Sequence, residues 1–353
     1  MRLHTNFPHH RAGILKLLDC AYEREAVQAA LLRWEAEPFE TAAAEAKLIA
    51  TMLRSPAEWA AHPQGKAVAG LPLLEISRIG EAPARRLPAG AARPLSGVRV
   101  LDLTRVIAGP VCGRTLAAHG AEVMRITAPH LPGLPELDID MGRGKLSAAL
   151  DLRAAEERER LAALARESHI FVQGYRPGGL AALGFSPEAL AEMRPGIVAV
   201  SLSAYGHEGP WANRRGFDSQ VQNASGINVA EAEARGVPPP KELPAQALDH
   251  ASGYLMAFGA MMALLRKARE GGSWHVRVSL AQTGHWLTGL GRLQCGFDRA
   301  EPTSEEIKAV LDAMDTPFGR LTFIRHAARL SETPAVWARP PVPLGTHAPV
   351  WPV

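Results

Sequence analysis

The stretch from Val98 to Ile126 is the feature that most limits the folds open to this chain. Val98–Leu103 is typical of a buried strand, Arg105–Pro110 of a tight turn, Val111–His119 of a helix and Glu122–Ile126 of a second strand. A strand, a turn of small residues, a helix and another strand in close succession form a βαβ unit, whose strands lie parallel in one sheet. The segment therefore predicts an α/β domain.

The same alternation continues after this unit. Further strands are expected at Leu146–Leu150, Ile170–Val172 and Ile197–Leu202, with helices between them at Ala154–Arg166 and Pro187–Met193. This order is typical of a Rossmann-like doubly wound parallel sheet, in which ligands bind at the carboxyl ends of the strands. We expect such a sheet, joined to a smaller, mostly helical domain and an irregular C-terminal tail.

The domain organisation follows from changes in pattern along the chain. The N-terminal part has apolar residues at helical spacing and one short strand, expected at Leu71–Ile76, and the next part is rich in proline. Near the C-terminus a helix is expected at Ser304–Met314, before Pro-rich irregular sequence. The predicted division is a small-domain-like helical region at 1–81, a linker at 82–95, a ligand-binding domain at 96–295 and a tail at 296–353.

Composition excludes several classes of function. The net charge is only +3, no run of Lys or Arg appears at either end, and no apolar run is long enough to span a membrane, so we expect neither a nucleic-acid nor a membrane partner. The N-terminus lacks the apolar core of a signal peptide, which favours the cytoplasm.

Cysteine and histidine usage points away from a metal site. Cys20, Cys112 and Cys295 are far apart and form no CxxC pair, which fits a reducing compartment and argues against disulfides or zinc. Of the 13 histidines, His9 and His10 are adjacent and have no partner at the i+3 or i+4 spacing of a helical metal site. We expect no metal and no permanently bound cofactor.

A lone carboxylate, Asp249, is expected to open a long helix that ends at Gly271-Gly272 and is charged only in its last turns. The alternating run His275–Ser279 then predicts a strand. One interpretation of Asp249 is a helix N-cap, because a carboxylate there accepts hydrogen bonds from unpaired backbone N–H groups. The other is a buried nucleophile, because an apolar helix behind the carboxylate shields it from water.

Four glycine-containing turns lie at or near the ends of the predicted strands. The turn Ile107–Pro110 lacks the GxGxxG spacing of dinucleotide sites, but its small residues let a ligand approach a helix N-terminus. The others are Gln173–Gly179, with an aromatic ring and a guanidinium, Ser203–Asp218, with two arginines, and the basic Gly142–Lys145. Each could be an ordinary glycine turn beside a solvated arginine. Together they favour a phosphorylated ligand.

These segments together resemble the family III coenzyme A transferases, the CaiB/BaiF family that includes formyl-CoA and carnitine-CoA transferases. The matching text is LSGVRVLDLTRVIAGPVCGRTLAAHGAEVMRI, GRGKLSAALDLR, VQGYRPGGLAALGF and VSLSAYGHEGPWANRRGFDSQVQNASG, followed by the Asp249 helix and its strand. The resemblance covers residues 96–290 almost continuously, and the tail RLSETPAVWARPPVPLGTHAP is also similar to the end of family members.

The resemblance implies a role for each matching residue. The family's nucleophilic aspartate falls on Asp249, although Leu248 replaces the glycine that usually precedes it. The residues that the resemblance implies for coenzyme A contacts are Val106, Ile107 and Ala108, then Leu150, Asp151, Leu152 and Arg153, then Gly174, Tyr175 and Arg176, and finally Arg215. An arginine common after the second strand of relatives is Ala128 here, which removes one expected phosphate contact.

The implied activity is transfer of coenzyme A from an acyl-CoA to a small carboxylic acid, through an aspartyl acyl anhydride and an aspartyl-CoA thioester. Coenzyme A enters as substrate, and the family's interlocked ring dimer implies a homodimer or a partner subunit. The N-terminal stretch TMLRSPAEWAAHPQGKAVAGLPLLEI is similar to the family's small domain, which normally follows the first part of the coenzyme A domain. The glycine-rich GGGG-type loop of formyl-CoA transferases is missing. The chain could therefore be the downstream part of a tandem fusion or a rearrangement.

Two alternatives stay open. A non-catalytic coenzyme A-binding subunit, or a truncated half, would share the same fold, because fold alone does not fix function. A 2-methylacyl-CoA racemase would pair the aspartate with a histidine, but Phe217 stands where that histidine is expected. His207 and His250 are the nearby histidines that could substitute for it.

Overall fold

The computed structural model describes residues 1–85, 91–293 and 296–352 of the chain. Their contacts group them into two compact units. Unit 1 contains Met1–Leu73, Ser203–Leu248 and Ser279–Phe297, and unit 2 contains Leu74–Leu202, Asp249–Val278 and Asp298–Val353. Both units are thus built from separate stretches of sequence, whereas the expected division at 1–81, 82–95, 96–295 and 296–353 was continuous; that division stays a prediction.

Unit 2 is built on a seven-stranded sheet with the order β3-β9-β8-β7-β4-β5-β6. Its strands are β3 (Glu75–Gly80), β4 (Arg99–Leu103), β5 (Glu122–Thr127), β6 (Lys145–Ala149), β7 (Ile170–Gln173), β8 (Val198–Ser203) and β9 (Ser273–Ser279). The neighbours from β8 to β6 pair in parallel, and β3 pairs antiparallel with β9. The predicted fold class is therefore confirmed.

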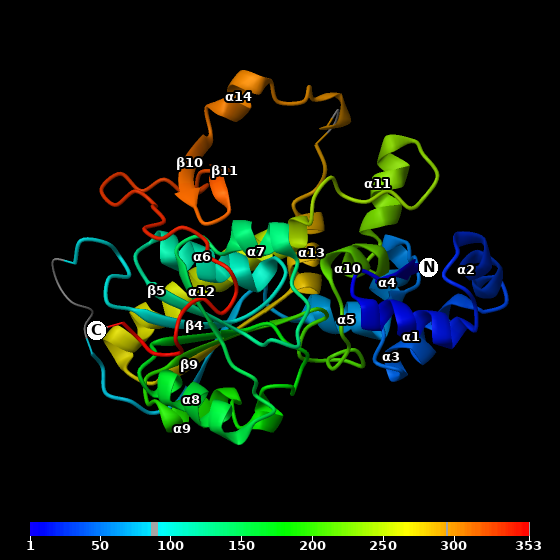
Figure 1. Ribbon diagram of the computed structural model, residues 1–353. Helices are drawn as coiled ribbons and strands as arrows, with labels where there is room; N and C mark the ends of the chain where they lie inside the picture. Colours follow the sequence, from blue (N-terminus) through cyan, green and yellow to red (C-terminus); the bar gives the residue numbers. More distant parts are fainter. Residues whose placement is uncertain (86–90, 294–295, 353) are drawn as a thin grey trace. The chain divides into compact units, whose positions relative to one another are not determined.

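Helices cover both faces of this sheet (Figure 1). The helices of unit 2 are α6 (Ala108–Ala118), α7 (Pro135–Met141), α8 (Ala155–Arg166), α9 (Pro187–Met193), α12 (Ala247–Glu270, from Asp249 on) and α14 (Ser304–Lys308). In Figure 1, α6 and α12 lie above the sheet, and α8 and α9 lie below it.

Alternation along the strands explains these two layers. On one face Val100, Val172 and Val200 join a core cluster with α6 and α12, and on the other Leu101 and Phe171 join a cluster with α8 and α9. Successive strand side chains point to opposite faces, so a strand buried on both faces is apolar throughout. The first cluster defines the α6/α12 face and the second the α8/α9 face.

Unit 1 is mostly helical. It contains β1 (Arg2–Leu3), α1 (Pro8–Leu18), α2 (Arg24–Leu31), α3 (Ala36–Glu45), β2 (Ala50–Thr51), α4 (Pro56–Ala61), α5 (Pro63–Gly70), α10 (Asp218–Ala224), α11 (Ile227–Arg235) and α13 (Leu280–Gly289). Buried Gln64 ties the unit together, since its amide donates to the carbonyls of Tyr205 and Glu208 and accepts from the Trp211 N–H.

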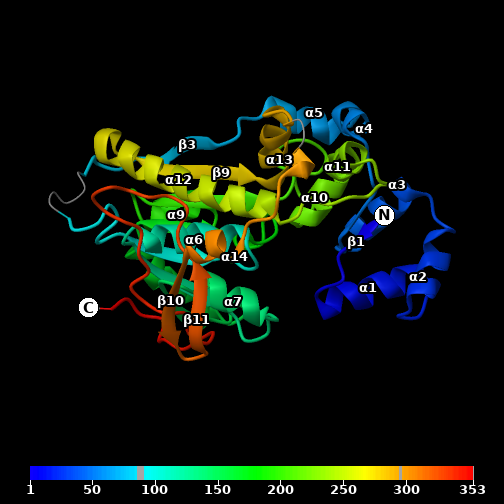
Figure 2. The ribbon, with the colours of Figure 1, turned by 90° about the horizontal axis from the view of Figure 1, so that it is seen from above.

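The tail after residue 297 differs from the prediction. The helix expected at Ser304–Met314 ends at Lys308, and Leu311–Thr316 instead forms β10, which pairs antiparallel with β11 (Gly319–Ile324). This expectation was wrong because tertiary burial decides the conformation here. Phe323 of β11 is buried in the core cluster of the α6/α12 face, and Leu311–Thr316 pairs with that strand. Figure 2 shows this hairpin beside α6 and α7.

Three boundaries also shift. The strand expected at Leu71–Ile76 is β3, which begins at Glu75, since its register is set by pairing with β9. The helix expected from Val111 begins at Ala108, so the turn Ile107–Pro110 is already the first turn of α6. α12 begins at Ala247, so Asp249 is its third residue rather than its N-cap.

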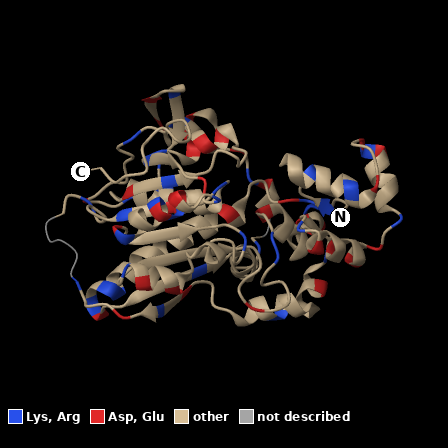
Figure 3. Ribbon diagram, turned by 60° about the horizontal axis from the view of Figure 1, so that its bottom comes forward, with Lys and Arg blue, Asp and Glu red and all other residues tan. Residues whose placement is uncertain are grey.

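Charge is spread over both units. Figure 3 shows Lys and Arg interspersed with Asp and Glu along the ribbon. None of the helices in the described part of the chain is long and apolar enough to cross a membrane.

Candidate active site

The turn between β4 and α6 is the first component of the site. Val106 has a φ of 72°, in the left-handed region that a β-branched residue rarely adopts. Ile107 occupies the N-cap position of α6, and Ala108 is its first residue. An apolar side chain at the N-cap cannot accept a hydrogen bond, so the first backbone N–H groups of α6 are left for solvent or a ligand.

A buried ion pair lies beneath this turn. The Lys145 Nζ lies 2.6 Å from Asp102 Oδ2 and donates to the Pro110 carbonyl over 2.9 Å. Thr104 donates its hydroxyl hydrogen to the same Asp102 carboxylate. Burial lowers the pKa of Lys145, and Asp102 opposes that shift. The network fixes β4, β6 and the first turn of α6 to one another.

Two glycines let α6 approach this network. A Cβ atom at Gly113 would lie 2.3 Å from Asp102 Oδ2, and one at Gly109 would lie 2.4 Å from Thr104 Cβ. Any larger residue at either position would push the N-terminal half of α6 away from the sheet. The glycines in AGPVCG therefore serve close packing of the helix.

The second component of the site is the start of α12. Asp249 is 7% exposed. Four residues on, a Cβ atom at Gly253 would lie 2.4 Å from the Ala108 carbonyl oxygen and 2.6 Å from Val111 Cβ. Tyr254 packs with Ile107 and Val111 in one hydrophobic cluster. We call this meeting of α12 with the first turn of α6 the α6–α12 contact.

Helix geometry relates Asp249 to this contact. Residues four apart lie on the same face of an α-helix, displaced by about 6 Å along its axis. Asp249 therefore lies one turn from Gly253, on the face of α12 that meets α6. The structure thereby places the predicted nucleophile one helical turn from the residue that approaches Ala108.

His250, the residue after Asp249, is half-buried. Burial lowers its pKa, and the positive charge of Arg114 lowers it further. The imidazole is therefore held in its neutral form near pH 7. Arg114 is itself held by Asp140, 2.5 Å away.

The segment after β6 holds four of the predicted contact residues. Leu150 is buried and Leu152 packs against the core of the α8/α9 face. Arg153 donates to the Asp151 carboxylate over 2.8 Å, and this hydrogen bond lowers the pKa of Asp151 to about 2. Asp151 and Arg153 thus form a local pair that is open to solvent.

The segment after β7 holds three more. Tyr175 is half-buried against the core of the α8/α9 face, and this burial raises its pKa. The positive charge of Arg105, from the turn after β4, opposes this rise in the pKa of Tyr175. Gly174 and Arg176 are exposed on either side of it. Because β4, β6 and β7 belong to the parallel part of the sheet, the loops that follow them share one edge.

The last predicted contact, Arg215, belongs to unit 1, where its guanidinium donates to the Lys47 carbonyl over 3.2 Å. Its neighbour Arg214 stacks on the ring of Trp211. The structure does not place Arg215 among the residues of unit 2.

One basic segment is unavailable to a phosphate. Arg143 is 2% exposed and lies over the rings of Phe323 and Trp337, and Lys145 is bound to Asp102. The expectation that Gly142–Lys145 helps bind a phosphorylated ligand was therefore wrong, because both cations point into the core. Within residues 1–85, 91–293 and 296–352, no group of three His, Cys, Asp or Glu side chains is placed to hold a metal ion.

Sequence reasoning missed Gly253 and Tyr254. The available signal was a glycine in an apolar helix, one helical turn after the candidate nucleophile. Such a glycine is typical of a close helix–helix approach.

Comparison with known proteins decides the family. The model of CoA-transferase family III matches residues 95–307. The chain belongs to CoA-transferase family III. The resemblance drawn from the sequence is thus confirmed for the family.

Two curated relatives are similar to this chain. An acetyl-coenzyme A transferase of Hypoxylon pulicicidum is 32% identical over 249 residues, which are 67% of this chain and 42% of the relative. A probable fatty acyl-CoA transferase of Mycobacterium tuberculosis, Rv3272, is 34% identical over 202 residues, 54% of this chain and 51% of the relative. The family III chain described here thus spans about half the length of these relatives.

The crystal structure of Rv3272 in its orthorhombic form is similar in fold. It superposes with a TM-score of 0.61 at 22% identity, covering 72% of this chain and 97% of that one. At this identity the similarity concerns the fold alone.

Proposed function

We propose that this family III chain transfers coenzyme A from an acyl-CoA to a carboxylic acid, with Asp249 as the nucleophile. The observation that carries the proposal is the close approach of Gly253 to Ala108, one helical turn from a carboxylate that is 7% exposed. A carboxylate shielded from water is a stronger nucleophile than a hydrated one, and the α6 N-terminus beside it suits negatively charged oxygens.

The proposed reaction needs four bond exchanges. The Asp249 carboxylate attacks the thioester carbonyl, the C–S bond breaks, and coenzyme A leaves as a thiolate with the bonding electrons. The thiolate then attacks the aspartyl carbonyl of the mixed anhydride and releases the first acid as its carboxylate, leaving an aspartyl-CoA thioester.

The second half of the reaction reverses these steps with the new acid. The acceptor carboxylate attacks the aspartyl thioester and releases the thiolate, which then attacks the acceptor's acyl carbon. This step restores the Asp249 carboxylate and gives the new acyl-CoA. Each step exchanges one activated acyl bond for another, so the reaction proceeds only where water cannot intercept the anhydride. Backbone N–H groups at the start of α6 are suited to stabilise the oxyanions.

The proposed coenzyme A contacts are the loops that share the carboxyl edge of the sheet. They comprise Val106, Ile107 and Ala108, then Leu150, Asp151, Leu152 and Arg153, and then Gly174, Tyr175 and Arg176, with Arg215 from unit 1 as a further candidate. A human relative, 32% identical over 192 residues, is a succinyl-CoA:glutarate CoA-transferase. We extend from it only the substrate class, an acyl-CoA and a small carboxylic acid. The assembly that we propose is a homodimer or a complex with a partner subunit.

Trapping of the covalent intermediate tests the proposal. The chain is incubated with an acyl-CoA and then with hydroxylamine, and peptide mass spectrometry looks for a hydroxamate on Asp249. The matched control is Asp315→Asn, which removes an exposed carboxylate of the β10–β11 hairpin. We expect the adduct in the unmodified chain and in Asp315→Asn, and its loss in Asp249→Asn. Coenzyme A binding without any adduct would instead identify a non-catalytic binding subunit.

A further inference from the structure

We propose that a pocket on the α8/α9 face of the sheet binds a small monocarboxylic acid with an apolar body, at a place separate from Asp249. The pocket has a volume of about 180 Å³, whereas a single water needs about 10–15 Å³ by the same measure. It is therefore large enough for a small organic molecule. All the residues that line it belong to unit 2.

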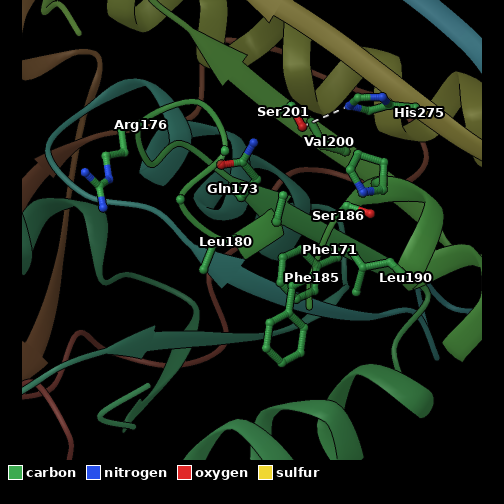
Figure 4. Close-up of a pocket in the computed structure, with 15 residues that line it drawn as sticks. Phe171, Gln173, Arg176, Leu180, Phe185, Ser186, Leu190, Val200, Ser201 and His275 are labelled. Atoms are coloured by element: carbon green, nitrogen blue, oxygen red, sulfur yellow. Dashed lines mark hydrogen bonds between the residues drawn. The ribbon is translucent and has the colours of Figure 1, made fainter. Parts of the chain in front are cut away.

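Three polar side chains form a row across adjacent strands of the pocket wall. Gln173 of β7 is the direct partner of Ser201 of β8, and His275 of β9 lies on the other side of Ser201. The His275 Nε2 and the Ser201 Oγ are 2.9 Å apart (Figure 4). We call Gln173, Ser201 and His275 the polar row.

Apolar side chains form the remainder of the wall. Two residues back along the same two strands, Phe171 pairs with Ala199, and both residues line the pocket next to the polar row. Phe185, Leu180 and Leu190 close it from the loop and from α9. The ring of Phe185 is parallel to that of Phe171, with their centroids 6.2 Å apart. The pocket thus offers an apolar volume with hydrogen-bonding groups on one side, as small-molecule sites do.

The chemistry of the lining selects the ligand. The Gln173 amide and the Ser201 hydroxyl can each donate, and Arg176 adds a positive charge at the edge. Of the described residues that line the pocket, none is Asp or Glu, so it is unsuited to a cation. A phosphate would leave the aromatic wall without a partner. A carboxylate on a small apolar body satisfies both parts of the wall.

This pocket is distinct from the α6–α12 contact. Phe171 and the helices beside it belong to the core of the α8/α9 face, while α12 packs on the opposite face. The sheet therefore separates the pocket from the helix that carries Asp249. A carboxylic acid in the pocket therefore cannot be the acceptor that attacks the Asp249 thioester. Of the proposed coenzyme A contacts, only Arg176 also lines the pocket, so the proposal does not depend on the proposed function.

Titration of the full chain with benzoate tests the proposal. Saturation-transfer NMR and calorimetry measure the binding. We expect saturable binding, weakened about 3- to 10-fold by Gln173→Leu and by Ser201→Ala, as expected for loss of one hydrogen bond. Ala181→Trp places a bulky ring at an exposed lining position and should abolish binding without disturbing the core. Ser203→Ala, on the same strand but outside the pocket lining, should bind like the unmodified chain.

The controls separate this site from the catalytic one. Asp249→Asn should bind benzoate as the unmodified chain does, and benzamide, which has the same shape without the charge, should bind more weakly. The proposal is overturned if benzoate fails to bind, if Ala181→Trp leaves binding intact, or if benzamide or adenine binds as tightly as benzoate. Loss of benzoate binding in Asp249→Asn alone would assign the acid to the face of the sheet that carries Asp249. That result would also overturn the proposal.

Discussion

Gly253 lies so close to Ala108 that a Cβ atom added to the glycine would be 2.4 Å from the alanine carbonyl oxygen. The obstacle is a backbone atom in the first turn of α6, which cannot move aside as a flexible side chain can. Position 253 therefore sets the distance between the two helices. The placement of Asp249, one turn earlier, depends on that distance.

Gly253→Ala should reduce both stability and formation of the Asp249 adduct. The added methyl group forces α12 away from α6, at a cost of about 1–3 kcal/mol in unfolding free energy. Urea unfolding followed by circular dichroism measures the stability, and hydroxylamine trapping measures the adduct. The control is Gly289→Ala, because an added Cβ atom there meets nothing within 4 Å. Equal adduct formation in the two variants would contradict the role of the close contact.

Lys145→Met should be strongly destabilising. It leaves the Asp102 carboxylate buried without its cation, which typically costs about 3–5 kcal/mol. The double variant Asp102→Asn/Lys145→Met should recover part of the loss, because it leaves no unpaired charge at this site. Chemical unfolding of the two variants measures the difference. A single variant as stable as the double would show that the ion pair contributes little.

Gln64→Leu should destabilise unit 1 by about 2–3 kcal/mol, because it leaves buried backbone groups without partners. The groups affected are the Tyr205 carbonyl and the Trp211 N–H. Thermal unfolding is the measurement, and Gln28→Leu, at an exposed position on α2, is the comparison. A loss as small as that of the comparison would count against the role of this amide.

Stability should fall as the pH drops from about 6.5 to about 4, in part through His169. Burial lowers the pKa of His169 from 6.5 to about 4, so in this range the unfolded chain binds a proton that the folded chain does not. The His169 Nδ1 accepts a hydrogen bond from the Arg99 N–H over 3.0 Å, which requires the unprotonated nitrogen.

His169→Asn keeps an acceptor near this N–H but cannot be protonated. The loss of unfolding free energy between pH 6.5 and 4 should therefore be smaller in this variant than in the unmodified chain. Urea unfolding at a series of pH values measures the slope. An unchanged slope would assign the acid sensitivity to other groups, such as His4, whose pKa burial also lowers to about 4.

The sequence was most informative where local pattern and tertiary burial agree. The strands β4 and β5 with α6 between them were predicted because strands that are buried on both faces are apolar throughout, and their helix has small residues at its start. The same reasoning failed at Leu311–Thr316, where residues compatible with a helix form a strand because Phe323 in its partner is buried. Only this tertiary contact determines that the segment forms a strand and not a helix.

The candidate site shows the same limit. Asp249 could be selected because it is the lone acid at the start of an apolar helix. Arg143 and Lys145 were predicted to be ligand-binding cations, since charge and glycine content do not reveal whether a side chain points outward or into the core. Their burial depends on Trp337 and Asp102, which are distant in sequence.

The left-handed backbone at Val106 has a consequence for ligand binding. Holding a β-branched residue in this region costs about 1–3 kcal/mol, and the surrounding packing must supply that free energy when the chain folds. The shape of the β4–α6 loop is therefore set before any ligand arrives. The proposed acyl-CoA substrate would then bind to a loop that already has its final shape. Little of the binding free energy would be lost to ordering that loop.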